Sequence, residues 1–261
     1  MQGLIHEQIG RSQMKVASLF RLAENVKRIR LVAGSDVPLQ PFRAGDFIEI
    51  HGVGERLGPR TALSLTGDPA CFGTYEVIVR RSPGHPDGLA SCLHERANRG
   101  THVYASGPQR GLSLAHGAAR HVFIAGGMGV TPFMSHLASL ADRGEPYELH
   151  FVFRRFAEIQ GICWLLERYR NGGSMNFYCT VAGERPNLSA ILSGWVPGTH
   201  FYVSGPRTLF AAAAKTATTV GLPAAVIHGD RGVAAGQCGS EVRIPSSGEA
   251  ASAPAAVTLN T

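Results

Sequence analysis

Three closely spaced glycines, Gly126, Gly127 and Gly129, follow a short apolar run and have the spacing that suits anion binding. Thr131 suits the N-cap of a helix, and Pro132 suits its first helical position. Glycines let backbone N–H groups approach an anion, and a helix N-terminus adds unpaired donors and the positive end of a dipole. The segment predicts a strand, a turn and a helix that together bind a pyrophosphate. A plain tight turn is the alternative interpretation.

A second turn of this kind follows the apolar run His200–Val203. It consists of Ser204, Gly205 and Pro206 and precedes a helical pattern. In an open α/β sheet, ligands bind outside the carboxyl ends of the strands. We therefore expect this turn and the glycine turn to open onto one crevice, although an ordinary strand-to-helix turn would have the same pattern.

Two adjacent arginines, Arg154 and Arg155, end the apolar run Glu148–Phe153. Guanidinium groups bind phosphate through paired N–H donors, and arginine accommodates the 2′-phosphate of NADP in nucleotide-binding α/β domains. The pair predicts binding at the adenosine end and a preference for NADPH over NADH. Solvated surface arginines are the alternative.

The N-terminal part has one candidate of its own, which begins at Arg60 and continues with alternating small and apolar residues to Leu65. Such a strand could bind a flat ring system and its phosphate; a strand with one exposed arginine is the alternative. The sequence contains no H-E-x-x-H, no G-x-S-x-G and no P-loop, and its eleven histidines show no metal-ligand spacing. We therefore expect no metal site.

Two kinds of sequence pattern surround these candidates. Up to about residue 110, short apolar runs alternate with glycine and proline turns, which predicts an antiparallel β-barrel or sandwich. From Arg120, apolar runs alternate with helical patterns, which predicts a parallel, Rossmann-like α/β sheet covered on both faces. The expected strands are Val16–Leu22, Val26–Val32, Asp46–His51, Thr61–Leu65, Thr74–Arg81, Thr101–Ser106, His121–Ala125, Glu148–Phe153, Asn176–Val181, His200–Val203 and Ala224–Ile227. The expected helices are Ser91–Ala97, Thr131–Asp142, Glu158–Tyr169, Leu188–Leu192 and Arg207–Val220.

The 261 residues accordingly divide into a barrel domain over residues 1–115, an α/β domain over 116–235 and a flexible tail over 236–261. No apolar run approaches the ~18 residues of a membrane span, which excludes a membrane-spanning protein. Only 17% of the residues are charged and 44% are hydrophobic, which excludes a mainly disordered protein. The start of the sequence shows no signal peptide, so we expect a cytoplasmic protein.

The net charge of +6 comes almost entirely from arginine, since the only lysines are Lys15, Lys27 and Lys215. Arginine suits anionic ligands or an acidic partner, although ordinary solubility charge is the alternative. The charges are not clustered with aromatic residues, which argues against nucleic-acid binding. The five cysteines contain no C-x-x-C pair, so the chain should not hold an iron–sulfur cluster or a structural zinc by itself.

Taken in order, these motifs resemble the ferredoxin–NADP reductase superfamily, and most closely the reductases of the phthalate dioxygenase and vanillate demethylase type. The resemblance runs from about Lys15 to Arg231, and its most specific part is the A-G-G-x-G-x-T-P segment Ala125–Pro132. The other matching segments are Arg60–Leu65 (R-x-Y-S-L-like), Gly88–His94 (G-S-x-x-L-H-like), Gly107–Leu114 (G-P-x-x-x-F-x-L-like), Phe153–Phe156 (S-x-R-S-like), Ser204–Pro206 (C-G-P-like) and Asp230–Gly232 (E-R-F-like).

The resemblance implies a flavin in the barrel, a nicotinamide nucleotide on the α/β domain and hydride transfer between them. It implies catalytic roles for Ser64 at the flavin ring, Ser204 at the nicotinamide and Asp230 in the terminal segment. The cofactor-binding residues that it implies are Arg60, Leu63, Ser64, Leu65, Ser91, Gly126, Gly127, Gly129, Thr131, Arg154, Arg155, Ser204, Gly205 and Pro206.

Several positions depart from the family pattern. Leu63 replaces the tyrosine that stacks on the flavin, Arg60 lies one position early, and Ser204 replaces a cysteine. Ser91 lies one place after the usual serine. In the terminal segment, Asp230 replaces the usual Glu and Gly232 replaces the usual Phe. These changes motivate an alternative, in which the chain is a degenerate, non-catalytic scaffold subunit of an oxygenase complex.

The expected cofactors are FMN, with FAD as the alternative, and NADPH or NADH. Close relatives of the family continue into a [2Fe-2S] domain with four cysteines, which we expect this chain to lack. The expected electron acceptor is therefore a ferredoxin-type protein or a terminal oxygenase subunit in a hetero-oligomer, with no membrane and no nucleic acid involved. A weaker alternative is the electron-transfer subunit of dihydroorotate dehydrogenase, which needs a clustered set of cysteines.

Overall fold

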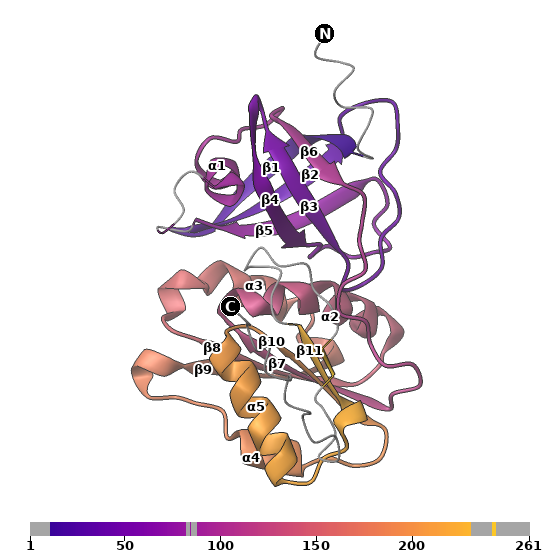
Figure 1. Ribbon diagram of the computed structural model, residues 1–261, viewed down its shortest axis with the longest axis vertical. Coiled ribbons are helices and arrows are strands. Elements are labelled where there is room, and N and C mark those ends of the chain that lie inside the picture. The colour runs from indigo at the N-terminus through magenta and orange to yellow at the C-terminus, as the bar shows by residue number, and fades with distance from the viewer. Residues whose placement is uncertain (1–10, 82–83, 85–87, 231–241, 244–261) are drawn as a thin grey trace, which may run out of the picture.

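The computed structural model describes residues 11–81, 84, 88–230 and 242–243. These residues form two units, each built on a six-stranded sheet, and the units lie one above the other in Figure 1. The first sheet uses the N-terminal half of the chain, and the second uses the C-terminal half. The predicted change of architecture along the chain is confirmed.

The first sheet is antiparallel and curls on itself. Its strands are β1 (Arg11–Ala23), β2 (Val26–Ala33), β3 (Phe47–Val53), β4 (Arg56–Ser64), β5 (Thr74–Arg80) and β6 (His102–Ser106), in the order β4-β3-β6-β1-β2-β5. The two edge strands meet beyond the end of β4, where Leu65 bridges Val77 and the Thr66 N–H donates to the Glu76 carbonyl over 2.8 Å. Because alternate side chains point inward, the strands enclose one apolar core. The predicted antiparallel barrel is confirmed.

A short helix lies within the barrel unit and packs against its strands. Helix α1 spans Leu89–Glu95 and contacts β3, β4 and β5. It begins two residues before the predicted Ser91, because Leu89 is buried in the barrel core together with Cys92 and Leu93. This spacing places the three side chains on one face of the helix.

The second sheet has five parallel strands and one antiparallel edge strand. Its strands are β7 (Arg120–Gly126), β8 (Tyr147–Phe153), β9 (Gly173–Cys179), β10 (Thr199–Ser204), β11 (Ile227–Asp230) and β12 (Val242–Arg243), in the order β12-β11-β10-β7-β8-β9. Its helices are α2 (Thr131–Arg143), α3 (Gln160–Glu167), α4 (Leu188–Ser193) and α5 (Arg207–Thr219). The short strand β12 lies within the segment predicted to be a flexible tail; the rest of the chain beyond Asp230 lies outside the described residues.

Both faces of the second sheet are covered, as the near-continuous apolar strands predict. Phe123 and Phe151 pack with residues of α2 and α3 on one face, whereas Val122 and Phe201 pack with residues of α4 and α5 on the other. Parallel strands buried on two faces explain why these runs lack polar alternation. No helix of the described residues is long and apolar enough to cross a bilayer.

Some predicted boundaries were wrong. The run Ala224–Ile227 is not a strand, because residues 224–226 form a 3₁₀ turn after a proline and pairing with β10 begins only at Ile227. The helix predicted to begin at Glu158 begins at Gln160, since a separate 3₁₀ turn occupies Phe156–Glu158.

The two units share apolar core. Val26 and Ile78 of the barrel belong to the same buried cluster as the residues of α2 and α3. At Gly161 of α3 the contact is especially close, because a Cβ there would lie 2.4 Å from the Leu22 carbonyl oxygen. The two units therefore meet over packed surfaces.

Candidate functional site

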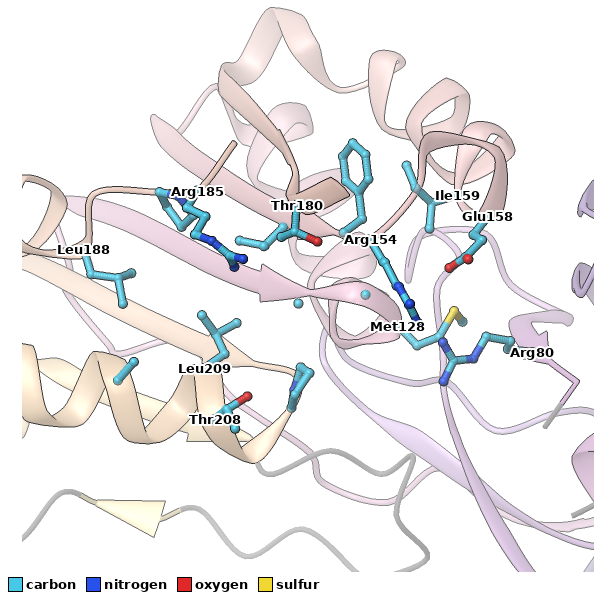
Figure 2. A pocket seen from close by; sticks show the side chains of 17 residues that line it. Arg80, Met128, Arg154, Glu158, Ile159, Thr180, Arg185, Leu188, Thr208 and Leu209 are labelled. Atoms are coloured by element: carbon cyan, nitrogen blue, oxygen red, sulfur yellow. The ribbon is translucent and has the colours of Figure 1, made fainter. Parts of the chain in front are cut away.

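An open cavity of about 510 Å³ lies at the carboxyl ends of the parallel strands, beside the barrel (Figure 2). It is lined by Arg80, Gly126, Gly127, Met128, Val152, Phe153, Arg154, Glu158, Ile159, Thr180, Arg185, Pro186, Leu188, Pro206, Thr208, Leu209 and Ala212. These residues come from the ends of β5, β7 and β8, from the turns and loops after β7, β8, β9 and β10, and from α4 and α5. The cavity is where ligands bind in open α/β sheets.

Four of the predicted nucleotide-binding residues line this cavity: Gly126, Gly127, Arg154 and Pro206. Their common position confirms that the two glycine-containing turns open onto one crevice. Arg155 is not among the lining residues; it is exposed and pairs with Glu158, with 3.5 Å between Nη1 and Oε1.

The glycines at the two turns differ in why glycine occupies the position. A Cβ on Gly129 would lie 2.4 Å from the Ser204 carbonyl oxygen, and a Cβ on Gly205 would lie 2.8 Å from that of Gly126. The two turns therefore pack backbone against backbone, and these positions need glycine for this contact. Gly127 differs, because it has a φ of +55° and nothing lies within 4 Å of its Cβ position. A side chain at this position would therefore point into open space.

Thr131 does not cap helix α2 as its position in the sequence suggested. The cap is Val130, because a 3₁₀ turn over Gly127–Val130 runs directly into the helix. The Thr131 hydroxyl instead donates back to the Met128 carbonyl over 2.9 Å, and Met128 lines the cavity. Thr131 therefore stabilises the turn from behind the cavity wall.

Ser204 lies at the end of β10, behind the cavity wall formed by Pro206. It is 1% exposed, and among the described residues its hydroxyl has no hydrogen-bond partner. Strand register places Ser204 opposite Ala125 of β7 and Asp230 of β11. Buried hydroxyls are normally hydrogen-bonded, so the arrangement leaves a polar group without the partner that it needs.

The cavity is rich in positive charge. Arg80, Arg154 and Arg185 contribute guanidinium groups, and Glu158 is the one carboxylate among the lining residues. Figure 2 shows Arg80 reaching from the barrel side toward Met128 and Arg154, whereas Arg185 approaches from the opposite wall toward Leu209. Such a site favours an elongated anion.

Sequence reasoning missed Arg80, Thr180, Arg185 and Thr208, although all four line the cavity. Thr208 could have been found, because it follows the Ser204–Pro206 turn by two residues and lies in the first turn of α5. The two arginines carry no local signal, since each reaches the cavity only through the packing of a distant loop or strand.

The predicted flavin residues of β4 fall on different faces of the strand. Arg60 is exposed and pairs with Glu49, with 3.3 Å between Nη1 and Oε2. Leu63 lies on the other side and packs against the barrel core, in which Leu65 is fully buried. Ser64, at the end of the strand, is 7% exposed. The structure therefore does not bring Arg60 together with Leu63.

Ser91, the remaining predicted flavin residue, lies in α1 and is 1% exposed. Asp230 lies at the end of β11. In the part of the chain that the structure describes, no group of three or more His, Cys, Asp or Glu side chains could hold a metal ion.

Behind the cavity floor lies a buried histidine that does not reach the cavity. His150 lies two residues before Val152 on β8, and its Nδ1 is 2.9 Å from the Tyr178 hydroxyl. Burial lowers the pKa of His150, although the nearby carboxylate of Glu148 opposes this shift. The ring also stacks on that of Tyr178, and these contacts fit a structural role.

Comparison with known proteins found relatives that are named as a reductase subunit and as an oxidoreductase. No protein-family model matches the chain. It is 29% identical over 216 residues to the carnitine monooxygenase reductase subunit of Escherichia coli (strain K12), which covers 83% of this chain and 67% of the relative. It is 27% identical over 255 residues to a vanillate O-demethylase oxidoreductase of Pseudomonas sp., which covers 94% of this chain and 78% of the relative.

The fold agrees with these relatives. Phthalate dioxygenase reductase, described as a modular structure for electron transfer from pyridine nucleotides to [2Fe-2S], matches with a TM-score of 0.76 at 22% identity, over 86% of this chain and 68% of that one. In sequence and in fold, the chain resembles reductases of the ferredoxin–NADP reductase superfamily. The predicted resemblance and the predicted enzyme class, an oxidoreductase, are confirmed. The chain spans about two thirds of the length of the first superfamily relative.

Proposed function

We propose that the chain is a flavin-dependent NAD(P)H reductase that supplies electrons to an oxygenase system. The observation that carries this proposal is the cationic cavity, which extends from the parallel strands to Arg80 of the barrel. The relatives support the oxygenase context, because their names describe reductase components of monooxygenase and demethylase systems. The proposed acceptor is a ferredoxin-type protein or a terminal oxygenase subunit.

The cavity residues fit a nicotinamide nucleotide. Arg154 and Arg185 supply paired donors for its phosphates, and the first turn of α5 adds the positive end of a helix dipole at Thr208. Gly127 leaves its backbone open beside the cavity, so an anion could approach closely. Ser204 has a buried hydroxyl in need of a partner close to the same turn.

The barrel residues fit a flavin, with one change from the sequence prediction. Leu63 offers a partly buried apolar side chain, and Ser64 offers a hydroxyl at the end of β4. Arg60 is paired with Glu49, whereas Arg80 reaches into the cavity from the barrel. We therefore propose Arg80 in place of Arg60 as the arginine for the flavin phosphate.

A flavin bound at the barrel would supply the conversion between two-electron oxidation of the nucleotide and one-electron transfer to the acceptor. The chain contributes binding and orientation. The turns at Gly126–Gly129 and Ser204–Pro206 would hold the nicotinamide end, and Arg154 would hold the adenosine end. The apolar walls at Val152 and Leu209 would exclude water. Hydride transfer needs no general acid or base, which agrees with a cavity that contains a single carboxylate.

The proposal also specifies which nucleotide and which flavin the chain binds. NADPH is the proposed nucleotide, because Arg154 and Arg185 line opposite sides of the cavity and either guanidinium group could bind a 2′-phosphate. FMN is the proposed flavin, because Gly107–Leu112 resembles the segment of FMN-dependent members.

One observation favours the non-catalytic scaffold as a second candidate. The pairing of Arg60 with Glu49 and the leucine at position 63 depart from the family's flavin-binding pattern. In this alternative, the chain keeps the fold and docks within an oxygenase complex without binding flavin.

A visible spectrum of the purified protein separates the two candidates. A flavoprotein should show bands at about 370 and 450 nm that bleach when NADPH is added without oxygen. Protein that remains colourless after incubation with FMN and with FAD would exclude the reductase and favour the scaffold. The flavin released by heating, identified by chromatography, then decides between FMN and FAD.

A further inference from the structure

The second turn of helix α2 makes two buried hydrogen bonds to the barrel unit. The Gly45 N–H donates to Ser135 Oγ over 2.9 Å, and His136 Nε2 donates to the Leu112 carbonyl over 2.7 Å. Ser135 is fully buried and His136 is 2% exposed. We call Ser135, His136, Gly45 and Leu112 the α2 clamp.

Gly45, Leu112 and His136 of the clamp approach one another closely because Gly45 has no side chain. Gly45 has a φ of +85°, and a Cβ there would lie 2.2 Å from the Leu112 carbonyl oxygen and 2.4 Å from His136 Nε2. The adjacent carboxylate of Asp46 shapes this turn, since it accepts a hydrogen bond from the Arg43 N–H over 2.8 Å. Position 45 therefore requires glycine for its backbone conformation and for its close approach.

The clamp continues on both sides into the proposed site. On the barrel side, the Asp46 carbonyl accepts a hydrogen bond from the Leu65 N–H over 2.9 Å, directly after Ser64. On the other side, α2 is the helix that the glycine turn Gly126–Gly129 leads into. One helix and a short series of hydrogen bonds thus join the end of β4 to the turn proposed to hold the nicotinamide.

We propose that Ser135 and His136 are positioning residues for hydride transfer, which fix the end of β4 relative to the glycine turn. This inference rests on the proposed reductase function. Neither residue lines the cavity. Transfer between two rings held by different units depends steeply on their separation, and a displacement of about 1 Å can slow a reaction about a hundredfold.

The test uses three variants of the full chain. Ser135→Ala removes the acceptor for the Gly45 N–H, His136→Leu removes the donor to Leu112, and His136→Gln keeps an N–H donor at a similar reach. Flavin reduction is followed by stopped-flow after anaerobic mixing with NADPH. We expect Ser135→Ala and His136→Leu to lower the limiting rate at saturating NADPH about tenfold or more, while the half-saturating concentration changes less than about twofold. His136→Gln should restore most of the rate.

A second readout does not depend on the flavin. Hydrogen–deuterium exchange of the protein without flavin should show faster exchange in residues 43–47 and 107–112 of Ser135→Ala, with β7 and β10 unchanged. The matched control is Thr199→Val, which removes a buried hydroxyl that has no hydrogen-bond partner among the described residues. It should change neither the limiting rate nor exchange in these segments.

Limiting rates in Ser135→Ala and His136→Leu that equal the wild-type rate would overturn the positioning role. A wild type whose bound flavin is not reduced by NADPH or NADH would instead contradict the proposed function, and the exchange experiment would still test the clamp. If His136→Leu fails to fold, Ser135→Ala decides the question.

Discussion

Gly129 and Ser204 lie so close that a methyl group on Gly129 would come within 2.4 Å of the Ser204 carbonyl oxygen. The two residues belong to turns 75 positions apart in the sequence, at the ends of the neighbouring strands β7 and β10. This contact sets how the two turns converge behind the cavity wall. It also separates two roles for glycine, because Gly127 in the same turn has open space at its Cβ position.

We expect Gly129→Ala to destabilise the protein strongly. Its Cβ would press on backbone atoms that cannot rotate away, and overpacking of this kind costs about 3 kcal/mol of unfolding free energy. Gly127→Ala is the matched control, since it places a side chain at a φ of +55° without a clash and should cost about 1 kcal/mol. Urea unfolding of both variants measures the difference. Equal losses would contradict the close packing of the two turns at Gly129.

We expect Arg154→Ala and Arg185→Ala each to raise the KM for NADPH about tenfold or more, and to raise the KM for NADH less. The reason is that both guanidinium groups line the cavity and can bind the additional phosphate of NADPH. Arg155→Ala is the control, because Arg155 is paired with Glu158 and does not line the cavity. Steady-state kinetics with both nucleotides tests the prediction. Equal effects on NADPH and NADH would contradict the proposed preference.

We expect the unfolding free energy to fall as the pH is lowered from about 6.5 to 4. Burial lowers the pKa of His136 in the folded protein to about 4, from an unfolded value of 6.5. Within this range the unfolded chain binds the proton first, so acid favours unfolding, by about 3 kcal/mol from this group alone. Burial also lowers the pKa values of His121 and His200, which adds loss in the same direction.

Two clamp variants make this prediction specific. His136→Gln removes the titrating ring and should flatten the pH dependence of the unfolding free energy between pH 4 and 6.5. Ser135→Ala breaks the same clamp without removing a titrating group, so its stability should fall by a similar amount at every pH. Urea unfolding across this range provides both curves. An unchanged slope in His136→Gln would show that His136 is not the titrating group.

The fold could be predicted from the sequence because its signals are local. Apolar residues at alternate positions predict the barrel strands, and the near-continuous run before Gly126 predicts a strand buried on both faces. The boundaries near Ile227 could not be found in this way, since they depend on where pairing with Phe201 begins. Periodicity gives the type of an element more reliably than its ends.

The site was only partly predictable, for a reason that Arg154 and Arg155 illustrate. Strand β8 ends at Phe153, and Arg154 directly after it lines the cavity, whereas Arg155 pairs with Glu158 and does not. The two arginines lie outside the regular strand, so its alternation could not have separated them. The positions of Arg80 and Arg185 could not be foreseen, because each enters the cavity from an element that becomes its neighbour only in the folded chain.

Glu158→Gln should improve NADPH binding. Glu158 is the one carboxylate among the residues that line the cavity, so its charge opposes an anionic ligand. Its pairing with Arg155 is exposed, and exposed ion pairs contribute at most about 1 kcal/mol, so the substitution should leave stability nearly unchanged. We expect the KM for NADPH to fall about threefold, which corresponds to a free energy below about 1 kcal/mol. Glu167→Gln is the matched control, since Glu167 forms an exposed pair with Arg170 at the same spacing but does not line the cavity. A KM that changes equally in the two variants would show that the overall charge of the protein, rather than the charge inside the cavity, controls binding.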